Sequence, residues 1–194
     1  MRFNIRGILV AAVIMAVAGL FQTGCAPQKV TKDTVVVLET TKGIIELSLN
    51  PDVAPKACDN FVKLVKRGYY DGQIFHRVIR GFMVQSGDPS GTGLAGESAS
   101  GLEFENELSA SVQFNRPGIL AMANRGPDTN ASQFFITVAP RPELNMKYTI
   151  FGEVISGIEA VQDMQGTPVD GNFRPLSEQK INKAYIKNAG FSLG

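Results

Sequence analysis

Residues 75–88 read FHRVIRGFMVQSGD, two strand-like segments joined by a short turn. Side chains alternate between the two faces of a strand, so Arg77 and Ile79 share one face, as do Met83 and Gln85. A guanidinium and a carboxamide therefore stand among large apolar side chains. This stretch predicts a β-sheet with one face that combines polar and apolar groups.

A second pair of segments carries the same combination further along the chain. Residues 118–124 read GILAMAN and residues 132–136 read SQFFI, which adds the carboxamides of Asn124 and Gln133. Together the segments place polar groups beside large apolar side chains. Spacing alone leaves two interpretations open: a binding site, or an ordinary barrel core with polar side chains that reach the solvent.

The rest of the chain adds short strands and two helices. Residues 34–49 hold a β-branched run, a turn and an alternating segment, which predicts a hairpin. A helix is expected from Pro55 until Gly68 ends it, and a shorter one at residues 157–164. Further strands are expected at residues 74–79, 81–85, 118–123, 133–138, 148–154 and 181–186. About eight strands without βαβ alternation indicate a mainly β fold, a closed eight-stranded antiparallel barrel capped by two helices.

Composition excludes several classes of protein. The 194 residues carry 19 basic and 18 acidic side chains, so the chain has no basic footprint for nucleic acid. A hydrophobic content of 44% suits one globular domain. Two cysteines and one histidine cannot build a closed zinc site or a disulfide framework. We therefore expect no metal and no cofactor.

Two other motifs point to chemistry that their surroundings do not support. Residues 91–96 match G-x-G-x-x-G, but loop composition follows where a dinucleotide site needs a helix. A hydrolase would have to use His76, the sole histidine, as its base. Cys58 lies three residues before the core-facing Phe61 and is expected to be a packed hydrophobe. Neither a nucleotide site nor a nucleophilic triad is predicted.

The first 24 residues have the pattern of a secretory signal. Two arginines and no acid precede an apolar stretch at residues 8–21. This stretch is shorter than the roughly 20 residues of a spanning helix. We expect residues 1–24 to be a signal peptide, with an ordinary cleavage after Ala18 as the alternative.

The end of this signal resembles that of a bacterial lipoprotein. Residues 21–25 read FQTGC, in which a small residue precedes Cys25, the expected site of lipidation. Gln22 departs from the pattern, because such signals generally carry leucine there. Residues 25–33 would then be the lipidated cysteine and a polar tether, and residues 34–194 the folded domain.

The strand segments closely resemble the signature of the cyclophilin-type peptidyl-prolyl isomerases. The match includes FHRVIRGFMVQSGD, the GTG at residues 91–93, GILAMANRGPDTNASQFFIT at residues 118–137 and YTIFGE at residues 148–153. It covers nearly the whole expected domain. The fold of this family, an eight-stranded antiparallel barrel closed by two helices, agrees with the strand count.

The resemblance implies roles for ten residues. Arg77 is similar to the catalytic arginine of the family, and Gln85 would orient it and contact the substrate backbone. Eight residues would bind substrate: Phe82, Met83, Phe135 and Leu144 around the proline ring, Ala123 and Asn124 through backbone groups, and Gln133 and Tyr148 along the groove.

Two positions depart from the family pattern. Tyr148 stands where the family often has histidine, and its hydroxyl can still donate a hydrogen bond. Glu143 stands where the family often has tryptophan. Neither change touches Arg77, so we expect them to alter ligand preference more than activity. His76 belongs to the motif and is interpreted as a packed structural histidine.

The resemblance implies an enzyme that rotates X-Pro peptide bonds, needs no cofactor and assists the folding of exported proteins. Its expected partners are proline-containing unfolded or extended polypeptides and, through the lipid, a membrane. The protein is expected to be a monomer in the cell envelope, facing the periplasm or the cell exterior. The alternative is a non-catalytic binding or chaperone module. Arg77 with Gln85 favours the enzyme, because binding an apolar ring would not need them.

Overall fold

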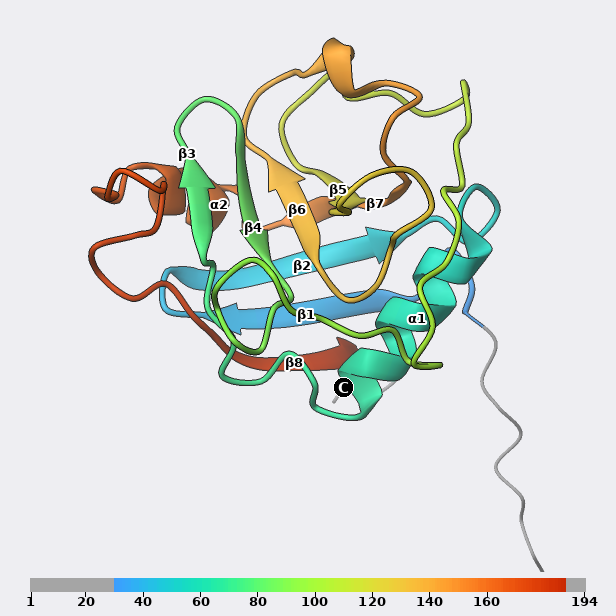
Figure 1. The fold of residues 1–194 in the computed structure, drawn as a ribbon, viewed down its shortest axis with the longest axis horizontal. Helices are drawn as coiled ribbons and strands as arrows, with labels where there is room; N and C mark the ends of the chain where they lie inside the picture. Colours follow the sequence, from blue (N-terminus) through green and yellow to red (C-terminus); the bar gives the residue numbers. More distant parts are fainter. Residues whose placement is uncertain (1–29, 188–194) are drawn as a thin grey trace, which may run out of the picture.

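The computed structural model describes residues 30–187 of the protein (Figure 1). The signal expected at residues 1–24, and Cys25, lie outside these residues. Within residues 30–187 no helix is both long enough and apolar enough to cross a membrane.

The domain begins a few residues earlier than the sequence indicated. Val30 is half-buried and packs against the core. The backbone then turns, with the Thr34 N–H donating to the Thr31 carbonyl at 3.0 Å, and Lys32 pairs with Asp52 (Nζ to Oδ2, 2.7 Å). Part of the expected tether is therefore folded, because its one large apolar side chain finds a place to pack.

Eight antiparallel strands form one curled sheet. Their order in the sheet is β3-β4-β6-β5-β7-β2-β1-β8. The strands are β1 (Val35–Thr40), β2 (Gly43–Leu49), β3 (Arg77–Ile79), β4 (Met83–Ser86), β5 (Ile119–Met122), β6 (Phe134–Thr137), β7 (Ile150–Ser156) and β8 (Ile181–Lys187). Each expected strand is present, most of them one to three residues shorter or shifted at the ends.

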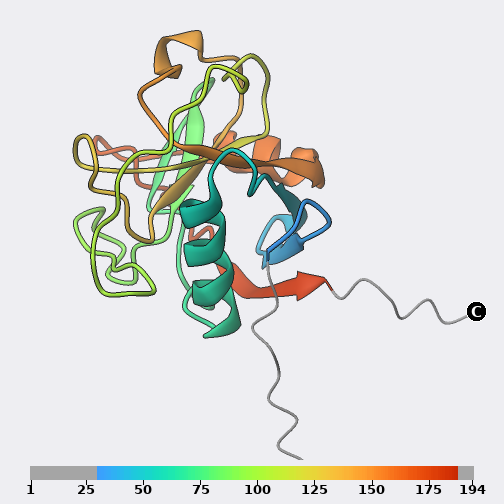
Figure 2. The same ribbon diagram turned by 90° about the vertical axis from the view of Figure 1, so that its right-hand side faces the viewer.

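The two helices lie at opposite ends of β1 and β2 (Figures 1 and 2). Helix α1 (Pro55–Lys66) begins at Pro55, as predicted, because the first turn does not need the N–H that proline lacks. Helix α2 (Ile158–Gln165) is displaced by one residue from the expected range. Helix α1 packs against β7 and β8, and α2 against β2, β3 and β4.

The expected closure of the barrel differs in the structure. Strands β3 and β8 are the two edges of the sheet. Backbone contacts join the residues just before β3 to those just before β8. They include the isolated bridge Ile74–Lys180 and a hydrogen bond from the Phe75 N–H to the Gln179 carbonyl (2.8 Å). Within residues 30–187 these contacts do not form a continuous ladder between β3 and β8. The eight antiparallel strands and two helices are confirmed, whereas the sheet is curled rather than fully closed.

Alternation along the central strands separates two hydrophobic clusters. On β5, Leu120 and Met122 point into the main core, while Ile119 and Ala121 belong to a second cluster. The main core also holds the apolar faces of α1 and α2. The second cluster includes Phe135 and lies on the opposite face of the same strands. Both faces are therefore buried, and the second cluster forms the base of the site described next.

Candidate active site

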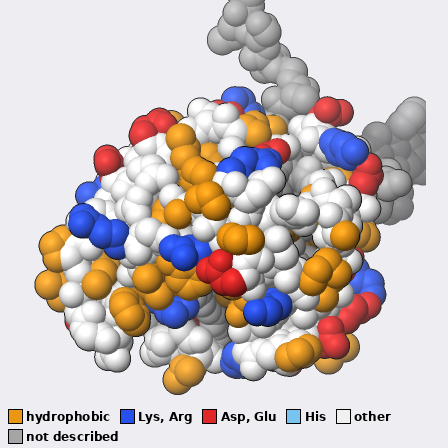
Figure 3. Space-filling view, turned by 90° about the horizontal axis from the view of Figure 1, so that it is seen from above, with side chains coloured by type: hydrophobic (Ala, Val, Ile, Leu, Met, Phe, Trp, Pro, Cys, Tyr) orange, Lys and Arg blue, Asp and Glu red, His pale blue; other side chains and the backbone are white. Residues whose placement is uncertain are grey.

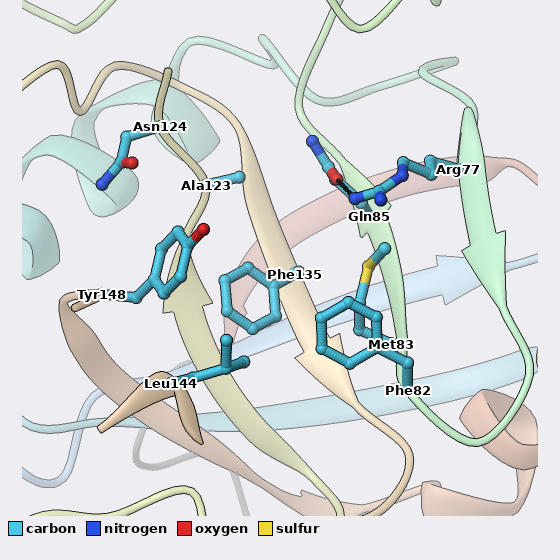
Figure 4. A pocket seen from close by; sticks show the side chains of 9 residues that line it. All are labelled: Arg77, Phe82, Met83, Gln85, Ala123, Asn124, Phe135, Leu144 and Tyr148. Atoms are coloured by element: carbon cyan, nitrogen blue, oxygen red, sulfur yellow. Dashed lines mark hydrogen bonds between the residues drawn. The ribbon is translucent and has the colours of Figure 1, made fainter. Parts of the chain in front are cut away.

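A pocket of about 130 Å³ opens on the second hydrophobic cluster (Figure 4). It is smaller than the roughly 300–1,000 Å³ typical of drug-sized ligands, so it suits a single ring or side chain. It contains both residues expected to be catalytic and seven of the eight expected to bind substrate. The lining residues are Arg77, Phe82, Met83, Gln85, Ala123, Asn124, Phe135, Leu144 and Tyr148.

Aromatic contacts hold the central wall of the pocket. Phe135 on β6 is 5% exposed. Its ring stacks on that of Phe114 (centres 5.9 Å apart, planes at 11°) and meets the edge of Tyr148 (5.5 Å, 88°). Such offset and edge-to-face contacts fix ring orientation. These contacts hold the apolar wall of the pocket in place.

Arg77 and Gln85 stand beside this apolar wall. They are register partners across β3 and β4, which places both side chains on the same face of the sheet. The Arg77 Nη1 donates to the Gln85 Oε1 at 3.4 Å. A guanidinium has five N–H donors, so several remain to meet a ligand. Figure 4 shows the pair next to Met83 and Phe82.

The opposite side of the pocket is formed by Ala123 and Asn124, which follow β5. The Ala123 N–H donates to the Gln133 carbonyl at 2.9 Å, so this donor is not available to a ligand. The Asn124 amide nitrogen lies 3.2 Å from the Asn106 Oδ1 and 3.3 Å from the Asn130 Oδ1. These bonds hold the Asn124 side chain, so a ligand here would meet mainly backbone groups.

Gln133 lies outside the proline-sized pocket. It lines an adjoining hollow that shares Gln85, Ala123 and Asn124 with the pocket. Its amide is hydrogen-bonded to Gln85 on one side and to the carbonyls of Gly93 and Ala95 on the other. The structure therefore brings nine of the ten predicted residues into one pocket and places Gln133 beside it.

The sequence analysis missed two residues that shape the pocket. Phe114 is fully buried beneath Phe135, and the guanidinium of Arg141 lies over the ring of Phe82. Both lie in irregular segments, where no periodic pattern tells which side chains face the site. In the sequence, only the isolated position of Phe114 in a polar stretch could have indicated that its ring is buried.

The rim of the site carries mixed charges. Arg141 pairs with Glu143 of the short 3-10 helix η1 (Pro142–Leu144), with Nη1 3.5 Å from Oε1. Figure 3 shows basic, acidic and hydrophobic side chains interspersed on the face seen from above. The face has no large field of a single sign.

Two reactive side chains outside the pocket, those of His76 and Cys58, are buried. His76 is 6% exposed, and burial lowers its pKa, so the ring is neutral at pH 7. Burial raises the pKa of Cys58 to about 12, and its thiol donates to the Phe151 carbonyl at 3.3 Å. Both occupy the packed positions that the sequence analysis favoured. Within residues 30–187 no three His, Cys, Asp or Glu side chains are grouped to hold a metal ion.

Comparison with known proteins shows which family this chain resembles. The family described as "Cyclophilin type peptidyl-prolyl cis-trans isomerase/CLD" matches residues 35–186. "Peptidyl-prolyl cis-trans isomerase-like 1" of Homo sapiens is 52% identical over 150 residues, 77% of this chain and 90% of the relative. Its namesake from Gibberella zeae is 51% identical over 153 residues, 79% of this chain and 94% of the relative.

Solved structures give the same result for the fold. A crystal structure of a cyclophilin type peptidyl-prolyl cis-trans isomerase from Cryptosporidium parvum superposes with a TM-score of 0.78 at 41% identity, covering 81% of this chain and 99% of that one. A second structure of that protein, determined in the presence of the dipeptide Ala-Pro, gives a TM-score of 0.77 at 41% identity, covering 79% and 99%. This chain therefore belongs to the cyclophilin-type peptidyl-prolyl cis-trans isomerases.

Proposed function

We propose that this protein catalyses cis-trans rotation about X-Pro peptide bonds, with Arg77 as the catalytic residue. The observation that carries the proposal is the placement of a guanidinium, oriented by Gln85, beside an apolar pocket. An X-Pro segment offers both an apolar ring and polar backbone groups, and this pocket matches the two together.

The chemistry needs only such a combination. Rotation about a peptide bond faces a barrier of about 18–20 kcal/mol, because amide resonance is lost in the twisted state. The proline nitrogen then acquires a localised lone pair. A guanidinium aimed at that nitrogen stabilises the twisted state and has little to bind in the planar one. Each tenfold increase in the rotation rate requires a barrier lower by about 1.4 kcal/mol. One charged hydrogen bond and the exclusion of water can therefore accelerate rotation by several powers of ten.

The pocket gives each part of the substrate a place. Phe82, Met83, Phe135 and Leu144 would hold the proline ring. The backbone at Ala123 and Asn124 would hold the residue before proline, so that the bond rotates between two held ends. The use of Ala-Pro with the Cryptosporidium parvum relative supports a small proline-containing peptide as the first substrate to test.

Purified protein comprising residues 26–194 would be assayed for isomerisation of an Ala-Pro peptide by NMR exchange spectroscopy. We expect exchange cross-peaks between the cis and trans forms at catalytic enzyme concentrations. A binding or chaperone module would instead shift the peptide resonances without accelerating exchange, and that result would overturn the proposed activity.

We further propose that the protein is a bacterial envelope lipoprotein that helps exported proteins to fold as a membrane-anchored monomer. This part rests on the sequence of residues 1–25, with its basic start, apolar stretch and Cys25 after a small residue. One acyl chain holds a protein weakly and two or more hold it stably, at about 0.8 kcal/mol per buried methylene. The short tether would keep the domain close to the membrane surface.

Metabolic labelling of the full chain with a clickable fatty acid tests the anchor. We expect labelled protein in the membrane fraction, with Cys25 as the first mature residue. Cys25→Ser should abolish labelling, whereas Cys58→Ala, which removes the buried thiol, should leave it intact. Unlabelled wild-type protein in the soluble fraction, with its mature N-terminus at another residue, would refute the lipoprotein assignment.

Light scattering of residues 26–194 measures the mass of the particle in solution. A mass equal to that of a dimer would refute the proposed monomer.

A further inference from the structure

A chain of side-chain amides leads from an outer loop to Arg77. The Gln133 Nε2 donates to the carbonyls of Gly93 (3.1 Å) and Ala95 (2.7 Å). The Gln85 Nε2 donates to the Gln133 Oε1 at 2.8 Å, and the Gln85 Oε1 accepts from Arg77. Three side chains and one loop are therefore joined in a single series.

The direction of every bond in this series is set by the loop. A carbonyl oxygen can only accept, so the Gln133 atom that faces Gly93 and Ala95 must be the nitrogen. The Gln133 oxygen is then turned towards Gln85, which must present its own nitrogen. This leaves the Gln85 oxygen on the side of Arg77, where it can accept from the guanidinium. The loop thus determines which way both amides are oriented.

The loop itself is held from its other side. The Asp88 carboxylate accepts from the backbone N–H of Gly93 (2.6 Å) and of Ala95 (3.3 Å). Asp88 is 1% exposed and also accepts from the N–H of Ser90 at 2.7 Å. The carbonyls that bind Gln133 therefore belong to residues whose N–H groups are fixed as well. A fixed pair of acceptors can orient an amide, which a mobile loop could not do.

The number of amide hydrogens still available differs between Gln133 and Gln85. Both Gln133 amide hydrogens are used by the loop, and its oxygen is used by Gln85. Gln85 donates one amide hydrogen to Gln133, and its second amide hydrogen remains available. The Gln85 side chain lines the pocket. A substrate carbonyl in the pocket can therefore be bound by Gln85, whereas Gln133 has no amide hydrogen left for it.

We infer that Gln133 is a positioning residue, which sets the orientation of Gln85 and through it that of Arg77, and donates no hydrogen bond to substrate. The inference rests on the proposed isomerase function. It reassigns Gln133, which the sequence analysis placed with the substrate-binding residues.

The test separates binding from rotation. Gln133→Met keeps the length of the side chain but removes the amide, so Gln85 would lose its fixed orientation. By NMR line-shape analysis with an Ala-Pro peptide, we expect the rotation rate on the enzyme to fall about three- to tenfold. The dissociation constant of the peptide should stay within about twofold of the wild-type value. The matched control is Gln179→Met, which lies outside the pocket and whose amide donates to the Ser177 carbonyl at 3.1 Å; both quantities should stay unchanged.

Two results would overturn the inference. Weaker peptide binding with an unchanged rotation rate would show that Gln133 contacts substrate, and no change in either quantity would show that the amide series does not matter. The nitrogen-15 spectrum of the Arg77 guanidinium gives a readout that needs no activity. Gln133→Met should speed rotation of this group relative to the wild type and to Gln179→Met. If the wild-type protein is inactive, the proposed function fails, while this spectrum still decides the inference about Gln133.

A second variant covers the case in which Gln133→Met does not fold. Gln133→Glu presents two oxygens to the loop carbonyls and cannot donate to them when ionised. Protonation restores one donor, so the rotation rate of this variant should rise as the pH falls from 7 to 5. Wild-type protein measured over the same range should lack this rise. A Gln133→Glu profile that follows the wild type would overturn the inference.

Discussion

The guanidinium carbon of Arg141 lies 5.1 Å from the centre of the Phe82 ring, so a cation covers the outer side of one pocket wall. Arg141 in turn pairs with Glu143, whose side chain is 56% exposed. A charged pair therefore stands at the rim where members of the family often carry an indole. The pocket wall itself remains apolar. Having Glu143 in place of an indole therefore affects ligands that extend across the rim more than groups that enter the pocket.

This rim predicts weak binding of cyclosporin, a cyclic peptide that inhibits many members of the family. Glu143 offers neither an apolar face nor an N–H donor, and covering its carboxylate costs desolvation. We expect a complex roughly ten- to several-hundred-fold weaker than that of an otherwise similar enzyme with tryptophan there.

Glu143→Trp should therefore tighten cyclosporin, measured by calorimetry, without greatly changing kcat/KM for a small peptide. Glu178→Trp adds the same indole away from the pocket and should leave the affinity unchanged. Nanomolar inhibition of the unmodified protein would show that Glu143 does not govern this surface.

Arg77→Ala should lower kcat/KM for an Ala-Pro peptide at least about tenfold, because the charge that stabilises the twisted bond is removed. The free energy of unfolding should change by less than about 1 kcal/mol, since Arg77 is only half-buried. Arg80→Ala removes an exposed arginine from the neighbouring turn and serves as the control. Near wild-type turnover by Arg77→Ala would mean that its assigned role is wrong.

Cys58 should be unreactive in the folded protein. Burial raises its pKa to about 12, so almost no thiolate exists at pH 8, and the side chain is fully buried. In residues 26–194, where Cys58 is the sole cysteine, iodoacetamide should label the protein in 8 M urea and not in buffer, as followed by mass spectrometry. Rapid labelling of the native protein would contradict the buried position.

The free energy of unfolding should decrease as the pH is lowered below about 6.5, because of His76. Burial lowers the pKa of this ring; Asp88 opposes the shift, and Arg174 and Arg77 act with burial. The unfolded chain therefore binds the proton more readily than the folded one. The contribution of neutral His76 is fully present above the unfolded pKa and is lost as the pH falls towards the folded pKa.

Urea unfolding at pH 7.5, 6.5 and 5.5 measures this dependence. His76→Gln removes the titrating group, so its unfolding free energy should change less between pH 6.5 and 5.5 than that of the wild type, whatever its absolute stability. Parallel curves for the two proteins would assign the pH dependence to other groups.

Gly87 should be far less tolerant of a side chain than Gly72. Both have positive φ (+92° and +78°), which costs a non-glycine residue about 1–2 kcal/mol. A Cβ at Gly87 would also overlap the Ser132 carbonyl and lie 2.7 Å from the Gln133 Cα, whereas nothing lies within 4 Å at Gly72. We expect Gly87→Ala to lower the unfolding free energy by more than about 3 kcal/mol and Gly72→Ala by only about 1–2. Equal losses in urea titrations would contradict this packing.

The sequence by itself determined the strands, both helices and most of the pocket. Alternation along residues 75–88 already placed Arg77 with Ile79 and Met83 with Gln85, because the period of a strand is a local property of the backbone. The start of helix α1 could be predicted from Pro55, because the first turn of a helix does not need the N–H that proline lacks. The family motifs then named the nine residues that the structure brings into one pocket.

Only the tertiary structure decided the place of Gln133, the covering of Phe82 by Arg141 and the way the sheet edges meet. The contacts of Gln133 with Gly93 and Ala95 join residues about 40 positions apart in the chain. Such contacts depend on how an irregular loop packs, and no periodic pattern encodes that. Local sequence sets which face a side chain takes, whereas the hydrogen-bond partners that orient it come from segments brought together by folding.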